Sequence, residues 1–305
     1  FSDSNGGLNA GRKNSTASLF PYYTDDKIID LTDITGSKTI IRLEIGGKRH
    51  IWEPFSDRNC GLKVERNLYK NRVGNKVVFE EVSIEAGLSF QYMWTFSEKY
   101  GFVKQSNLKN YSAQDFEVEI LDGIQNILPS GVDSGLQESR STLVDAYKKN
   151  ELDRESGLGI YSLSAMIVDK AEPSESLSCT TVWSKGLEAT NHLLSSVQLK
   201  QFRNGNDIIN EHDVRAEKGA YFVHSNINLK PSQTKTWHIV SEVNQSHTDV
   251  FNLRENIIQN ATLLENLAQD IDHNTTGLRK LVAKADGLQK TNDTLSTGRH
   301  FSNVL

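Results

Sequence analysis

Cysteine is scarce in this sequence. Only Cys60 and Cys179 occur in 305 residues, and they lie far apart along the chain. Two distant cysteines give neither a disulfide framework nor the clustered ligands of a zinc knuckle. We therefore expect two buried thiols, no metal site and no cofactor.

Long apolar runs are also missing. No segment approaches the roughly 20 apolar residues that a membrane-spanning helix needs, and the first residues show no signal-peptide pattern. We expect no membrane partner. A low cysteine content is typical of cytoplasmic proteins and also of many periplasmic proteins, so localisation stays open between these two compartments.

Positive charge is not in excess. The net charge is -5, with 34 Lys and Arg residues against 39 Asp and Glu residues, and the basic residues are spread thinly. A protein that binds phosphate backbones or anionic lipid carries its basic residues in clusters. Nucleic acid is therefore not expected as a partner.

Short segments that read as strands follow one another up to about residue 245. The expected strands are residues 28–34, 39–45, 49–55, 77–82, 88–96, 101–108, 116–121, 159–168, 177–183, 193–202, 219–229 and 236–243. Gly46 and Gly47 predict a tight hairpin turn between two of them. In residues 88–96 every second side chain is large and apolar, which predicts a strand with one buried face.

Two regions break the strand pattern. Residues 130–152 have spaced apolar side chains followed by Lys148 and Lys149, which suits a short helix with cations at its C-terminal end. From residue 250 to 288 the apolar spacing changes to the 3.6-residue repeat of helices. The residues Asn-Thr-Thr-Gly at 274–277 are expected to separate the two helices of a hairpin.

This order of elements limits the fold. More than ten expected strands without alternating βα units exclude a doubly wound fold and favour two packed antiparallel sheets. No repeat of fixed period is visible, which disfavours a propeller or a solenoid. The chain begins at Phe1 without an initiator Met and ends at Leu305 in an apolar stretch, so we expect a domain cut from a longer protein.

Four segments resemble a known family. They are NLKNYSAQDFEVEILDGIQNILP (107–129), GRKNSTASLFPYYTDDKI (11–28), STLVDAYKKNELD (141–153) and EPSESLSCTTVWSKGL (172–187). Together they resemble the N-terminal β-supersandwich domain, similar in topology to galactose mutarotase, of cellobiose-phosphorylase-type glycoside phosphorylases and hydrolases from bacteria.

The resemblance implies an architecture and a set of partners. Residues 1–245 would form a two-sheet antiparallel β-supersandwich, and residues 246–305 would form a C-terminal helical linker. In the family this linker leads to an (α/α)6 barrel with the catalytic carboxylates, so catalytic residues are expected beyond Leu305 and none within this chain. The implied partners are an oligosaccharide, the protein's own catalytic barrel and, in a homodimer, a second copy.

An aromatic and basic cluster in the N-terminal part is the best sequence candidate for carbohydrate contact. Flat apolar rings beside planar guanidinium donors suit sugar rings. The expected substrate-binding residues are Arg12, Tyr22, Tyr23, Trp52 and Arg58. The alternative interpretation is that aromatics at the ends of strands belong to the core.

Three functions stay open at this point. The first is a non-catalytic domain of a glycoside phosphorylase or hydrolase that supports the barrel and helps to shape its substrate site. The second is an autonomous glycan-binding module. The third, a mutarotase-like epimerase, needs a His acid and a carboxylate base in one cleft. His50, His224 and His238 lie on expected strands, but no local motif pairs them with a base, so each is expected to be half-buried and hydrogen-bonded.

Overall fold

The structure, a computed structural model, describes residues 17–21, 32–58, 62–167 and 175–284. In chain order the strands are β1 (Gly36–Ile45), β2 (Lys48–Trp52), β3 (Val64–Lys70), β4 (Val77–Ser83), β5 (Leu88–Ser97), β6 (Gly101–Asn110), β7 (Phe116–Ile127), β8 (Lys148–Asp153), β9 (Leu158–Leu163), β10 (Ser178–Lys185), β11 (Asn191–Leu193), β12 (Asp213–Arg215), β13 (Gly219–Leu229) and β14 (Thr234–Ser246). The helices are α2 (Ser134–Ser139), α3 (Ser141–Tyr147), α4 (Leu199–Arg203), α5 (His247–Gln259) and α6 (Leu263–Lys284).

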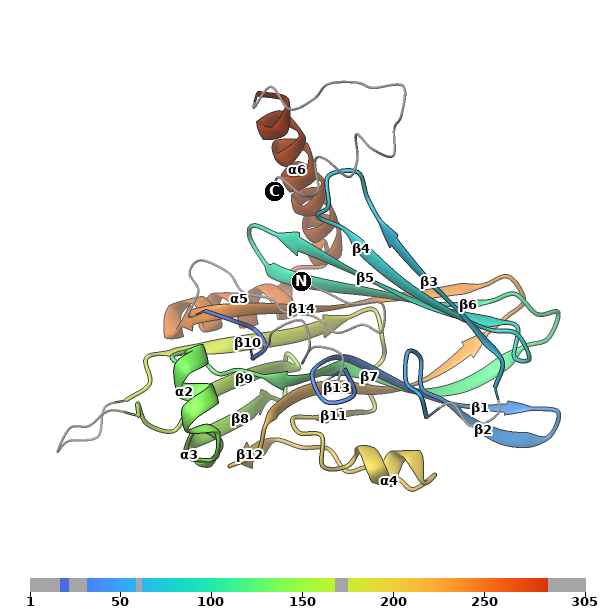
Figure 1. Cartoon of the computed structure of the whole chain (residues 1–305), viewed down its shortest axis with the longest axis horizontal. Coiled ribbons are helices and arrows are strands. Elements are labelled where there is room, and N and C mark those ends of the chain that lie inside the picture. Colours follow the sequence, from blue (N-terminus) through green and yellow to red (C-terminus); the bar gives the residue numbers. More distant parts are fainter. Residues whose placement is uncertain (1–16, 22–31, 59–61, 168–174, 285–305) are drawn as a thin grey trace.

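The strands form two antiparallel sheets that pack face to face (Figure 1). The five-stranded sheet has the order β11-β13-β7-β1-β2, and the nine-stranded sheet has the order β12-β8-β9-β10-β14-β6-β5-β4-β3. The expected fold class, mainly β with two antiparallel sheets and helices at the C-terminal end, is confirmed. The boundary between 1–245 and 246–305 as separate domains stays a prediction; β14 ends at Ser246 and α5 begins at His247.

The main core lies between the two sheets, and the alternation along each strand builds it. On β5 the inward side chains include Phe90, Tyr92 and Trp94, and on β7 they include Val118 and Ile120. Full burial of one such side chain stabilises the fold by about 1.5–3 kcal/mol. The expected one-sided strand at 88–96 is therefore present, within a slightly longer β5.

A buried ion pair crosses this core. Lys104 Nζ on β6 lies 2.6 Å from Asp122 Oδ1 on β7, and neither side chain is exposed. Thr39, Ser106 and Trp237 also donate hydrogen bonds to the Asp122 carboxylate, at 2.6, 3.3 and 2.6 Å. Burial lowers the pKa of Lys104, and the neighbouring carboxylate acts in the opposite direction. The pair joins the nine-stranded sheet to the five-stranded sheet.

Asp122 and Gly123 resemble a turn signal in the sequence, yet they lie in the middle of β7. A Cβ atom on Gly123 would lie 2.2 Å from the carbonyl oxygen of Tyr221 and 2.4 Å from the Phe222 ring. Glycine is required here because β13 and the Phe222 ring approach so closely, and not because the backbone turns.

Helices α5 and α6 cover part of the outer face of the nine-stranded sheet (Figure 1). Ser246 and Asp249 form a reciprocal capping box that starts α5 directly after β14. Along α6, Leu263, Leu267 and Ile271 pack against the sheet. The 3.6-residue apolar repeat therefore predicts the buried face of these helices correctly.

The expected break at residues 274–277 is wrong. Helix α6 continues through this segment, and Thr275 donates a hydrogen bond to the Ile271 carbonyl within the helix. The break lies at Asn260 instead, where the side-chain oxygen accepts hydrogen bonds from the backbone and hydroxyl of Thr262, at 3.0 and 2.9 Å. An Asn that bonds to the backbone two residues later favours a turn over a helix.

Two further expectations are wrong. The helix expected within 130–152 is present as α2 and α3, but it ends at Tyr147, and residues 148–153 form strand β8, paired with β9. Lys148 is buried and pairs with Asp145 at 2.7 Å rather than ending a helix in solvent. The strand expected at 193–202 ends at Leu193, and α4 follows, packing Leu199 and Phe202 on the outer face of the five-stranded sheet.

The remaining expectations concern the cysteines, one hairpin turn, the first strand and membrane-spanning helices. Cys179 is buried as expected, and burial raises its pKa to about 12; Cys60 lies outside the described residues. Gly46 and Gly47 form the expected hairpin turn with φ of 57° and 78°. Most of the strand expected at 28–34 lies outside the described residues. No helix in the described ranges is long and apolar enough to cross a membrane.

Candidate functional site

A groove of about 940 Å³ lies on the outer face of the five-stranded sheet, and we call it the sheet groove. Strands β1, β2, β7 and β13 form its floor, and the segment that follows α4 forms a wall. Because one face of each strand fills the core, the alternate residues point outward and are polar. The register places Arg42 opposite Glu119, and Glu119 opposite Asn226, so polar side chains form rows across the strands.

Beside these rows, a His and a carboxylate are in direct contact across adjacent strands. His224 Nε2 lies 2.8 Å from Glu119 Oε1, and Arg42 donates to Glu119 Oε2 at 2.7 Å. The other imidazole nitrogen, Nδ1, lies 3.3 Å from Nδ2 of Asn191. Both ring nitrogens and both carboxylate oxygens therefore have protein partners. An acid and a base that act on a sugar each need an atom free to reach it.

Arg42 is held in place by α4. Its guanidinium lies 3.7 Å from the centre of the Phe202 ring, and its Nε donates to the Phe202 carbonyl at 2.9 Å. Nearby, Arg203 makes two hydrogen bonds to Glu53, at 2.7 and 2.8 Å. Burial raises the pKa of Glu53, but the hydrogen bonds and charges of Arg203 and Lys38 outweigh burial and hold it below the usual value. This wall of the groove is therefore rigid.

Five exposed side chains stand on the strands of the sheet groove. They are Glu44, Arg49, Glu117, Asn226 and Asn228. None of these five has a side-chain hydrogen bond or ion pair to another described residue. Carboxylate, amide and guanidinium groups can each make two hydrogen bonds in one plane. Because they stand on strands, their positions are fixed by the sheet. The arrangement can donate to and accept from a hydroxyl-rich ligand.

Of the expected site residues, the structure describes Trp52 and Arg58, and neither lines this groove. Arg12, Tyr22 and Tyr23 lie outside the described residues. Arg58 is 53% exposed and lies 3.4 Å from Asp33, away from the groove lining. For these four, carbohydrate contact stays a prediction.

Trp52 has a different environment from the expected one. Its side chain is 0% exposed, it belongs to the core between the sheets, and its indole nitrogen donates to Glu81 Oε1 at 2.7 Å. A sugar ring stacks on an open aromatic face, and the Trp52 ring has none in this structure. The alternative interpretation, a core aromatic, matches its position.

The sequence of β13 contains a signal for the groove. In β13 the polar residues His224, Asn226 and Asn228 alternate with Val223, Ile227 and other inward residues. The pairing of His224 with Glu119, 105 positions apart, has no local signal. His224 is hydrogen-bonded as expected. His238 is half-buried as expected, but its buried Nδ1 has no hydrogen-bond partner in the described part of the chain. Burial lowers the pKa of His238 to about 4.

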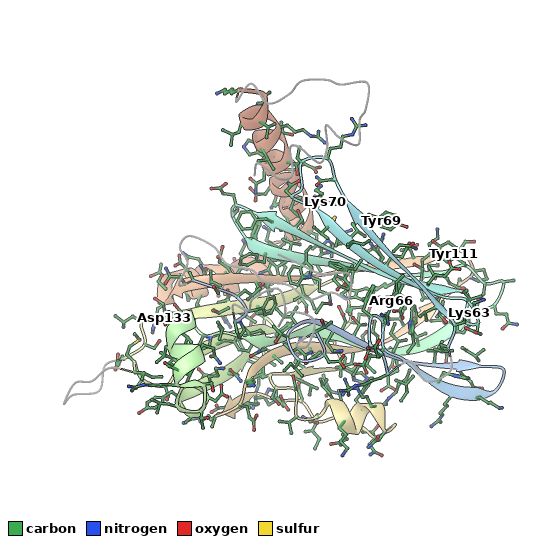
Figure 2. All side chains as sticks on the ribbon, in the orientation of Figure 1. Lys63, Arg66, Tyr69, Lys70, Tyr111 and Asp133 are labelled. Carbon is green, nitrogen blue, oxygen red and sulfur yellow. The ribbon has the colours of Figure 1, made fainter. Side chains whose placement is uncertain are left out.

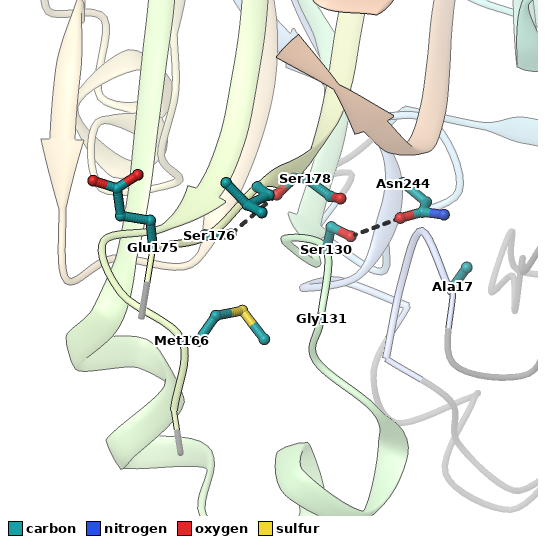
Figure 3. Close-up of a pocket in the computed structure, with 9 residues that line it drawn as sticks. Ala17, Ser130, Gly131, Met166, Glu175, Ser176, Ser178 and Asn244 are labelled. Carbon is teal, nitrogen blue, oxygen red and sulfur yellow. Dashed lines mark hydrogen bonds between the residues drawn. The ribbon is translucent and has the colours of Figure 1, made fainter. Parts of the chain in front are cut away.

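A second pocket, of about 380 Å³, lies between the end of β7 and the start of β10 (Figure 3). Its lining includes Met166, Glu175 and Ser130, and Ser130 donates to Asn244 at 3.5 Å. It has fewer exposed polar groups on strands than the sheet groove, so we place the candidate site in the groove. Within the described ranges, no group of three or more His, Cys, Asp and Glu side chains is arranged to hold a metal ion.

No protein-family model and no curated protein matches the chain. The structure is similar to a bacterial glucoamylase complexed with acarbose, with 10% identity over 99% of this chain and 37% of that one, at a TM-score of 0.49. It is also similar to a protein assigned as a kojibiose phosphorylase from the human microbiome (10% identity, 86% of this chain, 27% of that one, TM-score 0.39). A third similar structure is a GalM/aldose epimerase homologue from C. elegans (9% identity, 80% of this chain, 84% of that one, TM-score 0.35). The chain spans less than two fifths of the length of the first two.

Proposed function

We propose that this chain is a non-catalytic carbohydrate-binding domain of a glycoside phosphorylase or hydrolase, and that the sheet groove holds part of the oligosaccharide. The observation that carries the proposal is the set of five exposed polar side chains on the groove floor, held by strands and without partners among the described residues. Sugars are recognised by planar polar groups of this kind at fixed positions.

The charges of the groove favour a neutral ligand. Arg42 is neutralised by Glu119, and Arg203 by Glu53. The remaining groups, Glu44, Glu117, Asp207 and Arg49, mix both signs with a small acidic excess. A polyanion such as a sulfated glycan needs a clustered basic surface, so a neutral oligosaccharide fits better.

The non-catalytic part of the proposal rests on the His224 pair. A mutarotase-like epimerase would use a His and a carboxylate on different atoms of the sugar. Here the buried His224 and Glu119 of the groove lining bond to each other, and they also bond to Asn191 and to Arg42, respectively. This pair stabilises the groove floor and leaves the chemistry to residues of a catalytic barrel, the partner that the resemblance implies after the two helices.

The test is isothermal titration calorimetry of the chain against gluco- and galacto-oligosaccharides, with and without inorganic phosphate. We expect saturable binding that weakens about tenfold or more in the Asn226→Ala/Asn228→Ala variant, because each lost hydrogen bond is worth about 1 kcal/mol. Asn252→Ala is the matched control, since Asn252 is exposed on α5. It should bind like the unchanged chain.

Three results would contradict the proposal. Absence of binding across the whole panel would remove the carbohydrate-binding role. Equal binding by the groove variant and the control would place the site elsewhere. Cleavage, phosphorolysis or anomer exchange of a sugar by this chain would show that it is catalytic.

A further inference from the structure

The outer face of the nine-stranded sheet carries a row of polar side chains beside the part covered by α5 and α6. One residue of the row comes from each of five adjacent strands, β14, β6, β5, β4 and β3. The row consists of Thr236, Asn107, Gln91, Glu80 and Asn67, each opposite the next in the strand register. We call it the polar ladder.

Hydrogen bonds run along the polar ladder. Thr236 donates to Asn107 at 2.7 Å, and Asn107 donates to Gln91 at 3.4 Å. At the other end Asn67 donates to Glu80 at 3.1 Å. These bonds orient the side chains, so a ligand would not have to order them on binding. The members are half-buried or exposed and keep further donor and acceptor sites.

The spacing of the ladder is that of the sheet. Neighbouring strands lie about 4.8 Å apart, so five strands extend over about 19 Å. The spacing is close to the length of one sugar ring in an extended polysaccharide. A flat chain that crosses the strands would therefore meet one polar group for each sugar over about five sugars.

Two exposed tyrosines flank the ladder, Tyr69 on β3 and Tyr111 after β6 (Figure 2). They are 50% and 57% exposed. The Tyr69 hydroxyl donates to Glu80 at 2.9 Å, and the Lys109 ammonium lies 4.3 Å from the centre of the Tyr111 ring. Exposed rings of fixed orientation offer the apolar faces on which sugar rings stack.

The charges around the ladder balance. Glu65 and Glu80 lie among Lys109 and Lys185 on the same outer face. This mixture attracts neither a polyanion nor a polycation. A long neutral polymer rich in hydroxyl groups matches the amides and hydroxyls of the row.

We propose that the polar ladder binds a neutral polysaccharide in an extended, ribbon-like conformation, across the strands of the nine-stranded sheet. The ladder lies on the opposite side of the sandwich from the sheet groove, and the proposal stands whether or not the groove binds an oligosaccharide. It gives the chain a second role, attachment to a long polymer.

The test uses the 305-residue chain in native gels that contain hydroxyethylcellulose, and calorimetry with cellohexaose. We expect hydroxyethylcellulose to slow the unchanged chain. Gln91→Ala/Asn107→Ala should abolish this retardation, with about a fivefold loss of cellohexaose affinity for each amide removed. Asn252→Ala on α5 is the matched control and should be slowed like the unchanged chain.

Thr236→Lys is a second variant, because Thr236 is exposed and a longer charged side chain there would block the ladder without disturbing the core. It should also lose retardation while keeping its melting temperature. No retardation of the unchanged chain, or equal retardation of the ladder variants, would overturn the proposal. Loss of retardation only in the groove variant Asn226→Ala/Asn228→Ala would also overturn it, because the polymer would then bind in the sheet groove. Equal retardation in gels that contain helical amylose would overturn the ribbon conformation.

Discussion

The indole nitrogen of Trp52 lies 2.7 Å from Oε1 of Glu81, and both residues are fully buried, with 0% exposure. Glu81 also accepts hydrogen bonds from Arg66 Nε at 2.8 Å and from the Phe55 backbone at 2.7 Å. Trp52 is thus both a core side chain and a donor to a buried carboxylate. Its removal would affect folding before it affects any ligand.

Trp52→Ala is therefore expected to lower the free energy of unfolding by about 3–5 kcal/mol, the usual cost of a large aromatic lost from a core. Trp52→Phe should cost less, about 1–3 kcal/mol, because it removes the donor to Glu81 and keeps most of the ring. Urea unfolding measures both. An unchanged midpoint for Trp52→Ala would contradict this placement and restore Trp52 as a candidate for sugar contact.

Lys104→Met is expected to lower the free energy of unfolding by about 3–5 kcal/mol, because it leaves the Asp122 carboxylate buried without its ammonium partner. Lys109→Met, on the same strand but on the outer face, is the matched control and should cost less than about 1 kcal/mol. Urea unfolding measures the free energy of unfolding of both variants. Similar costs for the two variants would show that the buried pair contributes little.

Stability should fall as the pH decreases from 6.5 to 4. Burial lowers the pKa of His192 and of His238 to about 4, below the unfolded value of about 6.5. The unfolded chain therefore binds more protons in this range, and each histidine removes on the order of 1–2 kcal/mol of stability by pH 5. His238→Gln should lose less stability between pH 7 and pH 5 than the unchanged chain. His247 is exposed, so His247→Gln is the control. An equal pH dependence in the unchanged chain, His238→Gln and His247→Gln would contradict the prediction.

Two glycines should respond oppositely to alanine. A Cβ on Gly277 would meet nothing within 4 Å, whereas one on Gly123 would lie 2.2 Å from a backbone oxygen. Gly277→Ala should stabilise the chain by up to about 1 kcal/mol, because alanine is the better helix former in the interior of α6. Gly123→Ala should prevent folding or destabilise the chain strongly, because two strands would have to move apart. Thermal unfolding with circular dichroism separates the cases, and no gain for Gly277→Ala would question the continuity of α6.

Patterns along the chain predict the fold well where one face of an element is buried. The alternation in β5 and β13, the Gly46-Gly47 turn and the apolar stripe of α5 and α6 all have a local physical cause. Strand β3 was not expected, because its residues 65–70 are exposed and show no alternation. The end of β11 at Leu193 depends on packing of Phe202 against another element, and residues 193–202 alone do not show it.

The candidate site was less predictable than the fold. An aromatic residue near the end of a strand looks the same in sequence whether it faces a sugar or the core, and Trp52 faces the core. The contacts of Arg42 with Glu119 and with Phe202 join residues 77 and 160 positions apart. Such contacts follow from strand order, which one sequence does not give. The outward polar residues of β13 are the part of the groove that alternation could have indicated.

The ion pair of Lys104 and Asp122 has a mechanical consequence. If either sheet slid by one residue along its strands, the ammonium or the carboxylate would meet apolar side chains. Separating two buried charges costs several kcal/mol per ion, so sliding of one sheet over the other is strongly opposed. A pull on α6 or on the rim of the sheet groove would therefore move the whole sandwich as one stiff block, with little shear between its layers.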